Sequence, residues 1–299
     1  MSSPPPQDRS GPLYALGAYA LWGFFPLYWA MLKAASAPEV LGHRIAGTFA
    51  LLLVWMAATR RWTLLLGLDR RRLGLLAGAS ALVTLNWLTY IWGVQNGHVV
   101  ETSLGYFINP LVNVGLGVWL LGERMRRPQL VAIGLAAVAV LILTVDYGRV
   151  PWIAFTLALT FAFYGLLKKK AGVPSVPALF VETAFVAPLA VAYLVSLRLE
   201  GTDTLLRLGA THDLLLLGAG VATAIPLLLF GAAANRVALS TLGVLQYLAP
   251  SIQFVCGVAF LGEEMPPTRW AGFAFVWVAL MVFSWDALRT ARRQRRAEP

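Results

Sequence analysis

The sequence predicts an all-α polytopic membrane protein with ten transmembrane helices in two inverted five-helix repeats. Hydropathy, the placement of basic residues and an internal repeat each contribute to this prediction. The chain has 299 residues, 59% of them hydrophobic and 13% charged, and its mean hydropathy is +0.70. A soluble domain carries about 25% charged residues. The composition therefore indicates an integral membrane protein, with no room for a sizeable soluble domain.

Ten apolar runs are long enough to cross a bilayer as helices, which takes roughly 20 consecutive apolar residues each. These runs do not alternate as membrane strands do, so helices rather than a barrel are indicated. The spans are expected near residues 12–32, 38–58, 73–95, 98–121, 129–146, 150–167, 178–197, 213–234, 238–261 and 270–288.

The basic residues lie mostly on one side of the predicted membrane. With a cytoplasmic N-terminus, the cytoplasmic loops and the C-terminal tail hold most of the 24 Lys and Arg residues. Arg44 lies within a span. The positive-inside rule then places both termini in the cytoplasm. The net charge of +10 is read as an orientation signal rather than as a nucleic-acid surface.

An internal repeat relates the two halves of the chain. GVWLLGERM at 117–125 matches GVAFLGEEM at 257–265 at an offset of 140, and the same offset pairs Pro110 with Pro250. We therefore expect a first five-helix repeat at 1–147 and a second at 148–299, which carries the basic tail. An odd number of spans inverts the second copy, and inverted repeats are typical of secondary transporters.

The stretch YFINPLVN, residues 106–113, places polar side chains near the bilayer midplane. Tyr106, Asn109 and Asn113 are spaced to share one helix face. The offset of 140 maps Tyr106 to Gln246, beside Tyr247, so the second repeat also carries polar groups at this depth. Such a stripe forms either interhelical hydrogen bonds or the wall of a solute cavity. We favour the cavity.

Further aromatic and amide side chains lie deep in the predicted spans. A mostly apolar pocket with aromatic walls and a few amides suits a small amphiphilic solute. The residues expected to line the substrate-binding cavity are Trp22, Asn86, Tyr90, Tyr106, Asn109, Tyr164, Gln246 and Tyr247.

Ionisable residues within spans are rare, and they are functional candidates by default. His43, Arg44 and Glu182 are expected to form a gate or polar contacts between the halves, although snorkelling to the interface is an alternative. Four prolines are expected to bend their helices: Pro26, Pro110, Pro226 and Pro250. The sequence has no P-loop, catalytic motif or metal-ligand cluster, so no enzyme, cofactor or metal is expected.

Several motifs together resemble the RarD-type branch of the EamA family, within the drug/metabolite transporter superfamily. The motifs cover nearly the whole chain: Trp22-Gly23, His43-Arg44, SLGYFINPLVN at 103–113, LGER at 121–124, FAFYGLLKK at 161–169, VET at 181–183 and LSTLGVLQYLAP at 239–250. The resemblance implies ten helices in two inverted repeats around a central cavity that opens alternately to each side. Superfamily members of this design include exporters of amino acids and related metabolites.

The expected function is export of small metabolites, preferably neutral or aromatic amino acids, across the bacterial inner membrane by alternating access. A drug or other amphiphilic solute exporter and a facilitative, channel-like permease stay open as alternatives. The partners expected are a small-molecule substrate and the lipid bilayer, with no nucleic acid. A monomer is plausible, and the sequence leaves the oligomeric state open.

Overall fold

The structure is a computed structural model that describes residues 10–121, 126–234, 236, 242 and 245–297, with side chains for all of these except 117–121, 234 and 291–297. Ten α-helices lie in this part of the chain, which contains no strand, so the all-α prediction is confirmed. They are α1 (Ser10–Met31), α2 (Ala37–Thr59), α3 (Arg70–Gln95), α4 (Val99–Leu121), α5 (Arg127–Tyr147), α6 (Trp152–Ala171), α7 (Ser175–Glu200), α8 (Ala210–Ala234), α10 (Leu248–Val255) and α11 (Pro267–Ala297). A short 3₁₀ helix, η1 (Arg61–Leu65), follows α2, and a π-helical turn, η2 (Cys256–Phe260), continues α10.

Seven of these helices are long and apolar enough to cross a membrane: the apolar parts of α2, α3, α5, α6, α7, α8 and α11. The multi-pass membrane fold is thus confirmed, although ten spans were predicted. Helices α1 and α4 fall outside the seven. The first carries three tyrosines and two tryptophans, and the second carries Glu101 and two asparagines. These side chains lower the mean hydropathy of the two helices.

Local sequence signals explain several helix ends. Ser36 caps α2 by accepting a hydrogen bond from the Glu39 amide at 3.3 Å, and Asp69 caps α3 by accepting one from the Arg72 amide at 2.7 Å. Gly148 and Gly172 end α5 and α6 with φ of 63° and 61°, a left-handed conformation that glycine adopts without a steric penalty.

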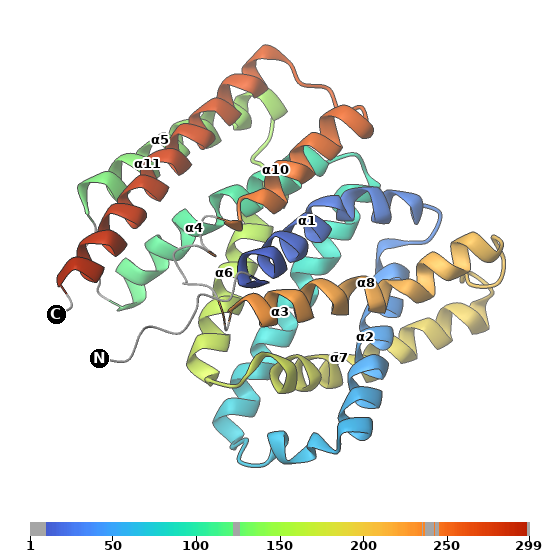
Figure 1. Cartoon of the computed structure of the whole chain (residues 1–299). Helices are drawn as coiled ribbons and strands as arrows, with labels where there is room; N and C mark the ends of the chain where they lie inside the picture. Colours follow the sequence, from blue (N-terminus) through green and yellow to red (C-terminus); the bar gives the residue numbers. More distant parts are fainter. Residues whose placement is uncertain (1–9, 122–125, 235, 237–241, 243–244, 298–299) are drawn as a thin grey trace.

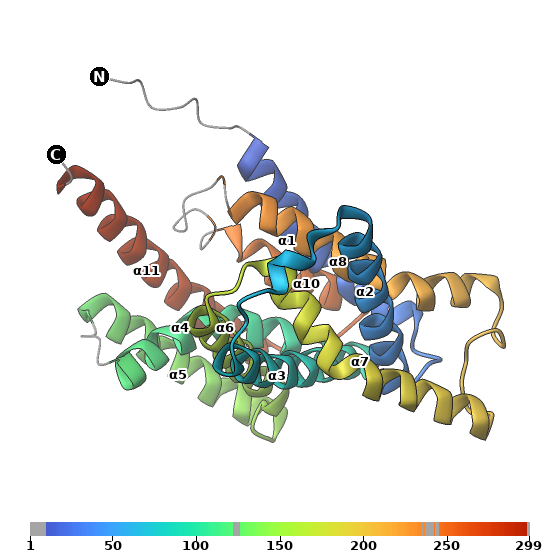
Figure 2. The ribbon, with the colours of Figure 1, turned by 90° about the horizontal axis from the view of Figure 1, so that it is seen from below.

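Most helices of the first predicted repeat pack against helices of the second. Helix α1 lies on α8 and α10, α2 lies on α7 and α8, and α3 and α4 lie on α6. Helices α5 and α11 lie side by side along one edge of the molecule, opposite the edge reached by α7 and α8 (Figures 1 and 2). The α2–α8 contact is close, because a Cβ atom on Gly220 would lie only 2.5 Å from the carbonyl carbon of Gly47.

The two ends of the bundle differ in charge. One end, which we call the carboxylate end, gathers the connections 32–36, 96–98, 148–151, 201–209 and 261–266. It holds Glu39, Glu101, Asp146, Asp203 and Glu263. The other, which we call the basic end, holds the arginines at 60–61, 70–72 and 126–127 and the lysines at 168–170.

Candidate functional site

Arg44 lies in the interior, on the eighth residue of α2, with only 3% of its surface exposed. Its guanidinium carbon lies 4.0 Å from the centroid of the Trp87 ring, 5.2 Å from that of Trp29 and 5.9 Å from that of Phe25. Within the described part of the chain, its Nε and Nη1 atoms have no hydrogen-bond partner. We call Arg44 and these three rings the arginine cage. It brings α1, α2 and α3 together around one buried positive charge.

Two tyrosines of the predicted cavity lie beside the arginine cage. Tyr90 and Tyr106 are within electrostatic range of Arg44, and their rings meet edge to face at 5.7 Å. The Tyr106 hydroxyl donates to Asn86 Oδ1 at 3.0 Å. The Tyr90 hydroxyl is buried and has no hydrogen-bond partner among the described residues. Tyr90 is thus the member of the pair that still has a free donor.

Asn86 links three helices. Its side-chain amide donates to the Leu157 carbonyl at 3.0 Å and to Thr160 Oγ1 at 2.9 Å, both on α6, while its oxygen accepts the hydroxyl of Tyr106 on α4. A buried amide with all of these bonds made holds α3, α4 and α6 in register.

The asparagines of YFINPLVN also face α6. Asn109 donates to the Ala158 carbonyl at 3.0 Å and accepts from Asn113 at 3.0 Å. Gly105 allows this approach, because a Cβ atom there would lie 2.8 Å from the Ala154 carbonyl oxygen. In this conformation the stripe forms interhelical hydrogen bonds, the alternative that we did not favour. Whether it also lines a solute cavity stays a prediction.

Glu182 and Tyr164 form a separate cluster on the side of the basic end. Glu182 is 1% exposed, and its carboxylate lies 3.2 Å from Lys168 Nζ and accepts the Tyr164 hydroxyl at 3.1 Å. The backbone carbonyl of Glu182 accepts from Ser80 at 2.6 Å. The Glu182 charge is therefore neutralised within its own helix hairpin, α6–α7.

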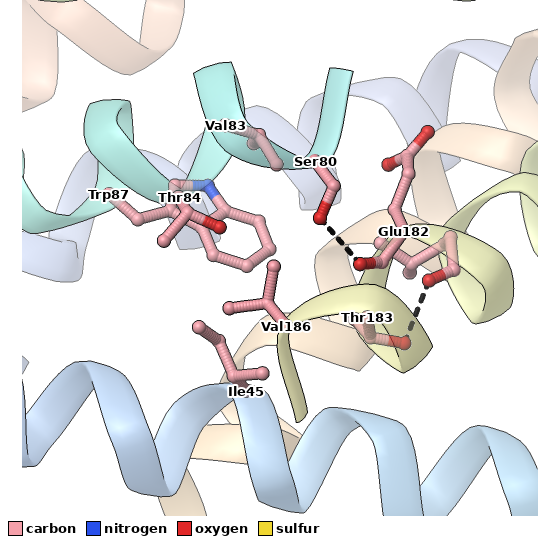
Figure 3. Close-up of a pocket in the computed structure, with 9 residues that line it drawn as sticks. Ile45, Ser80, Val83, Thr84, Trp87, Glu182, Thr183 and Val186 are labelled. Atoms are coloured by element: carbon pink, nitrogen blue, oxygen red, sulfur yellow. Dashed lines mark hydrogen bonds between the residues drawn. The ribbon is translucent and has the colours of Figure 1, made fainter. Parts of the chain in front are cut away.

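A small cavity lies between α2, α3 and α7, next to Glu182 (Figure 3). Its volume of about 10 Å³ is at the lower limit for a single water molecule. Ile45, Trp87 and Val186 form its apolar wall, and Ser80 and Thr183 add hydroxyls. Trp87 borders both this cavity and the arginine cage.

His43 lies nearer the carboxylate end, within range of the charges of Glu39 and Asp203. Glu39 is 1% exposed and accepts from the amide of Thr204 at 2.6 Å and from its hydroxyl at 2.9 Å. That hydroxyl also lies 2.8 Å from His212 Nε2. His43 and Glu182, which the predicted repeat places at related positions, therefore lie in different polar clusters.

Two further carboxylates, those of the buried Glu101 and the half-buried Glu263, cap helix starts at the carboxylate end. Glu101 accepts from the Ile153 amide at 3.1 Å and pairs with Arg149 at 2.7 Å. Glu263 accepts from the backbone amides of Val99 and Val100 at the start of α4, and its burial raises the pKa of its carboxyl above the ordinary value. These side chains border a polar depression of about 320 Å³ that also includes His98, Asp146 and Arg269.

The remaining predicted cavity residues are dispersed. Trp22 packs on Tyr19 and Phe230, with ring centroids 5.7 and 5.8 Å away, and its carbonyl accepts from Gln253 Nε2 at 3.1 Å. Tyr247 packs in a different apolar cluster, with Phe254 and Phe273. Gln246 lies half-buried just before α10. The structure thus brings Asn86, Tyr90 and Tyr106 together with Arg44. Trp22 packs against the same apolar cluster as Tyr90, whereas Tyr247 packs in another.

Three of the predicted helix-bending prolines lie inside helices: Pro26 in α1, Pro110 in α4 and Pro226 in α8. Pro250 is the third residue of α10, where a missing amide hydrogen costs no helical bond. Bending at these positions stays a prediction. Among the described residues, no group of three or more His, Cys, Asp and Glu residues could hold a metal ion.

Comparisons with known proteins identify the family. A family model for EamA-like transporters matches residues 9–145. Protein RarD of Streptomyces exfoliatus is 52% identical over 291 residues, which cover 97% of this chain and 92% of that protein. Protein RarD of Escherichia coli is 43% identical over 289 residues, 96% of this chain and 98% of that protein. The chain belongs to the EamA family of transporters.

As an EamA transporter of the RarD type, the protein is not an enzyme, and the resemblance described above is confirmed. A transporter of Bacillus subtilis, YojE, is 37% identical over 97% of this chain and 98% of its own length. A protein of known crystal structure has the same fold, with a TM-score of 0.59 over 93% of this chain and 98% of that chain at 17% identity.

Sequence reasoning did not identify several polar residues of this EamA transporter that make contacts between distant segments. Glu39, Thr204 and Glu263 join distant parts of the chain at the carboxylate end, but none was singled out as a site. Glu263 carried a signal, because it belongs to the repeated LGE element. The other copy, at 121–123, lies outside the described side chains.

Proposed function

We propose that this EamA transporter exports small metabolites, with neutral or aromatic amino acids as the first class to test, across the inner membrane by alternating access. Its bacterial relatives support the location, and the basic end supports cytoplasmic termini under the positive-inside rule. The protein acts as a monomer in this proposal. Two inverted repeats, 1–147 and 148–299, provide the machinery.

The proposal rests on one observation about the helix contacts. When each helix of a contacting pair is replaced by its predicted counterpart in the other repeat, the result is another contacting pair. Helix α1 packs on α8, and its counterpart α6 packs on α3. Helix α4 packs on α6, and α10, which belongs to the ninth predicted span, packs on α1. The pairs α2–α7 and α5–α11 each consist of two counterparts, so the replacement leaves them unchanged. This is the pattern that an inverted repeat produces.

The ion pairs between α5 and α11 follow the same exchange. Arg126, just before α5, pairs with Asp286 in the C-terminal half of α11 at 3.1 Å. Arg269, near the start of α11, pairs with Asp146 near the end of α5 at 2.8 Å. These two ion pairs tie both ends of α5 to α11, which supports a shared ancestry of the two helices.

The packing also suggests which units move. Helices α3, α4 and α6 form one unit, joined by Asn86 and Asn109, and helices α1, α8 and α10 form its counterpart. Each unit mixes helices of both repeats. Alternating access is then the rocking of these two units, while the α2–α7 and α5–α11 pairs connect them.

The carboxylate end is the closed gate in this proposal. Glu39 contacts Thr204, Glu101 contacts Arg149, and Glu263 contacts Val99. Each contact joins a residue of one repeat to a residue of the other. With cytoplasmic termini, the structure is closed toward the outside, and an export cycle must break these contacts.

The test is solute counterflow in proteoliposomes, with a panel of labelled amino acids and with or without a proton gradient. We expect saturable counterflow of at least one neutral or aromatic amino acid. Asn109→Ala and Tyr90→Ala should reduce it, whereas the exposed Asn96→Ala and Tyr193→Ala should not. Full flux in the first two variants would show that Asn109 and Tyr90 do not line the solute path.

The same assay separates the alternatives. Flux that does not saturate and shows no counterflow would indicate a channel-like permease. Amphiphilic drugs that exchange while no amino acid does would indicate a drug exporter.

A further inference from the structure

Arg44 is a buried positive charge that has no carboxylate partner among the described residues. A guanidinium stays protonated in proteins, so burial cannot neutralise it by deprotonation. Burying a charge whose hydrogen bonds are not made is strongly unfavourable, and such a charge persists in a fold only if something compensates it. The Nε and Nη1 atoms of Arg44 lack partners within the described residues.

The buried acidic residues of the described part all have other partners. Glu39 binds Thr204, Glu101 binds Arg149, Glu182 binds Lys168, Asp203 binds Arg198, and Asp286 binds Arg126. None of these contacts involves Arg44. Within the described residues, then, the compensating anion for Arg44 does not come from a carboxylate.

The rings of the arginine cage compensate the charge only in part. The face of Trp87, 4.0 Å from the guanidinium carbon, attracts it electrostatically. A ring face does not satisfy the planar fork of N–H groups, which matches two oxygens of a carboxylate or phosphate. The unpartnered hydroxyl of Tyr90 supplies a further donor within electrostatic range.

We propose that Arg44 and Tyr90 bind an oxyanion group of the transported solute, a carboxylate or a similarly small acid, while Trp29 and Trp87 hold its apolar or aromatic part. The inference rests on the proposed function and adds the chemical group that the solute must carry. One guanidinium offers one counter-charge, so the site selects monoanionic groups over multiply charged solutes.

Entry to this site requires Trp87 to move. Trp87 contacts Arg44 and also borders the small cavity of about 10 Å³, which Ser80 and Glu182 line as well (Figure 3). The cavity is too small for a solute. Arg44 lies about 10 Å along α2 from the start of that helix at the carboxylate end. Rotation of Trp87 would join the cavity to the arginine cage.

The test uses the purified full-length protein in detergent, with thermal unfolding and tryptophan fluorescence as readouts of binding. The probes are phenylalanine, phenylalaninamide, 3-phenylpropionate and benzylphosphonate. We expect phenylalanine and 3-phenylpropionate to stabilise the protein and to change its fluorescence, and the amide to do neither. Benzylphosphonate takes a second negative charge near neutral pH, so it should bind more weakly than 3-phenylpropionate.

Three variants test the role of Arg44. Arg44→Met should weaken binding of 3-phenylpropionate about 100-fold, the scale expected when one partner of a buried charged pair is removed. Arg44→Lys keeps the charge but loses the fork, so about a 10-fold loss is expected. Arg61→Met is the matched control, because Arg61 also lies over a tryptophan, Trp55, but is exposed.

Stability without ligand distinguishes a binding arginine from a structural one. Arg44→Met should unfold at the same or a higher temperature than the wild type when no ligand is present, because an uncompensated charge has been removed. Arg149→Met leaves the buried Glu101 without its ion-pair partner, so this variant should unfold at a lower temperature than the wild type. The inference is overturned if no acid stabilises the wild type, if Arg44→Met binds acids normally, or if it destabilises the protein as Arg149→Met does.

Counterflow separates this inference from the proposed function. If the wild type exchanges phenylalaninamide as well as phenylalanine, with saturation, transport stands and the oxyanion requirement fails. If no probe shows counterflow, the proposed function fails, and the binding measurements alone decide the role of Arg44.

Discussion

Two buried charges of opposite sign lie one position apart in the two predicted repeats. On α2, His43 and Arg44 lie early in the helix, and the predicted repeat aligns them with Glu182 and Thr183 of α7, so Glu182 corresponds to His43 rather than to Arg44. Glu182 is neutralised by Lys168 and Tyr164, whereas Arg44 is surrounded by rings and has no acidic partner among the described residues. Similar placement in the two predicted repeats thus does not give similar chemistry. The compensated charge contributes to the scaffold, and the uncompensated one is the charge that we propose to bind a ligand.

The largest effect on stability is expected from Lys168→Met. Removing one partner of a buried ion pair costs about 3–5 kcal/mol. Lys168 is 23% exposed, which lets water reach the pair, so we expect a loss of about 2 kcal/mol in the free energy of unfolding. Denaturation in mixed micelles would measure it. The double variant Lys168→Met/Glu182→Leu should recover most of the loss, and failure to do so would mean that Glu182 is not the reason for the effect.

The next effect has the opposite sign. Arg44→Met should leave the free energy of unfolding of the ligand-free protein unchanged or raise it by about 1 kcal/mol, because an uncompensated buried charge is replaced by an apolar side chain of similar length. The same denaturation measurement checks it. A loss as large as that of Lys168→Met would remove the contrast between the two sites.

The asparagine stripe should contribute less. Interhelical hydrogen bonds in membrane proteins average about 0.6 kcal/mol. Asn109 makes one such bond, to the Ala158 carbonyl of α6, and one bond within α4, from Asn113, so Asn109→Ala should cost about 1 kcal/mol. The predicted repeat aligns Asn109 with Ala249, so the second half has no amide at this position. A loss of transport far larger than the loss of stability would indicate that Asn109 also contacts the solute.

The smallest effect is expected at Glu263. Burial raises the pKa of this carboxyl, so its ionised form is disfavoured in the folded state. Stability from this group is therefore highest below the ordinary pKa of glutamate, and it declines as the pH rises through the raised value. Compared with Glu263→Gln, the wild type should be relatively more stable at pH 4 than at pH 8, as thermal unfolding at both values would show. An equal difference at the two pH values would contradict this assignment.

The helices and the placement of polar groups within them could be predicted, but the partners of those groups could not. The spacing of Tyr106, Asn109 and Asn113 indicated one polar face on α4. Their partners include the carbonyl of Ala158 and, through Asn86, that of Leu157. Backbone carbonyls of an apolar helix leave no trace in a sequence pattern, so the hydrogen-bonded role of the stripe could not be distinguished from a cavity wall.

The sequence by itself determined the membrane class, the helices, the family and the position of Arg44 within a span, because hydropathy, basic clusters and motifs are local properties. Only the tertiary structure decided which charges are compensated. Arg44 and Glu182 are both ionisable residues in apolar helices, and the difference between them depends on side chains supplied by α1, α3 and α6. Compensation of a charge is a matter of distance across the fold, and distance is set by helix packing.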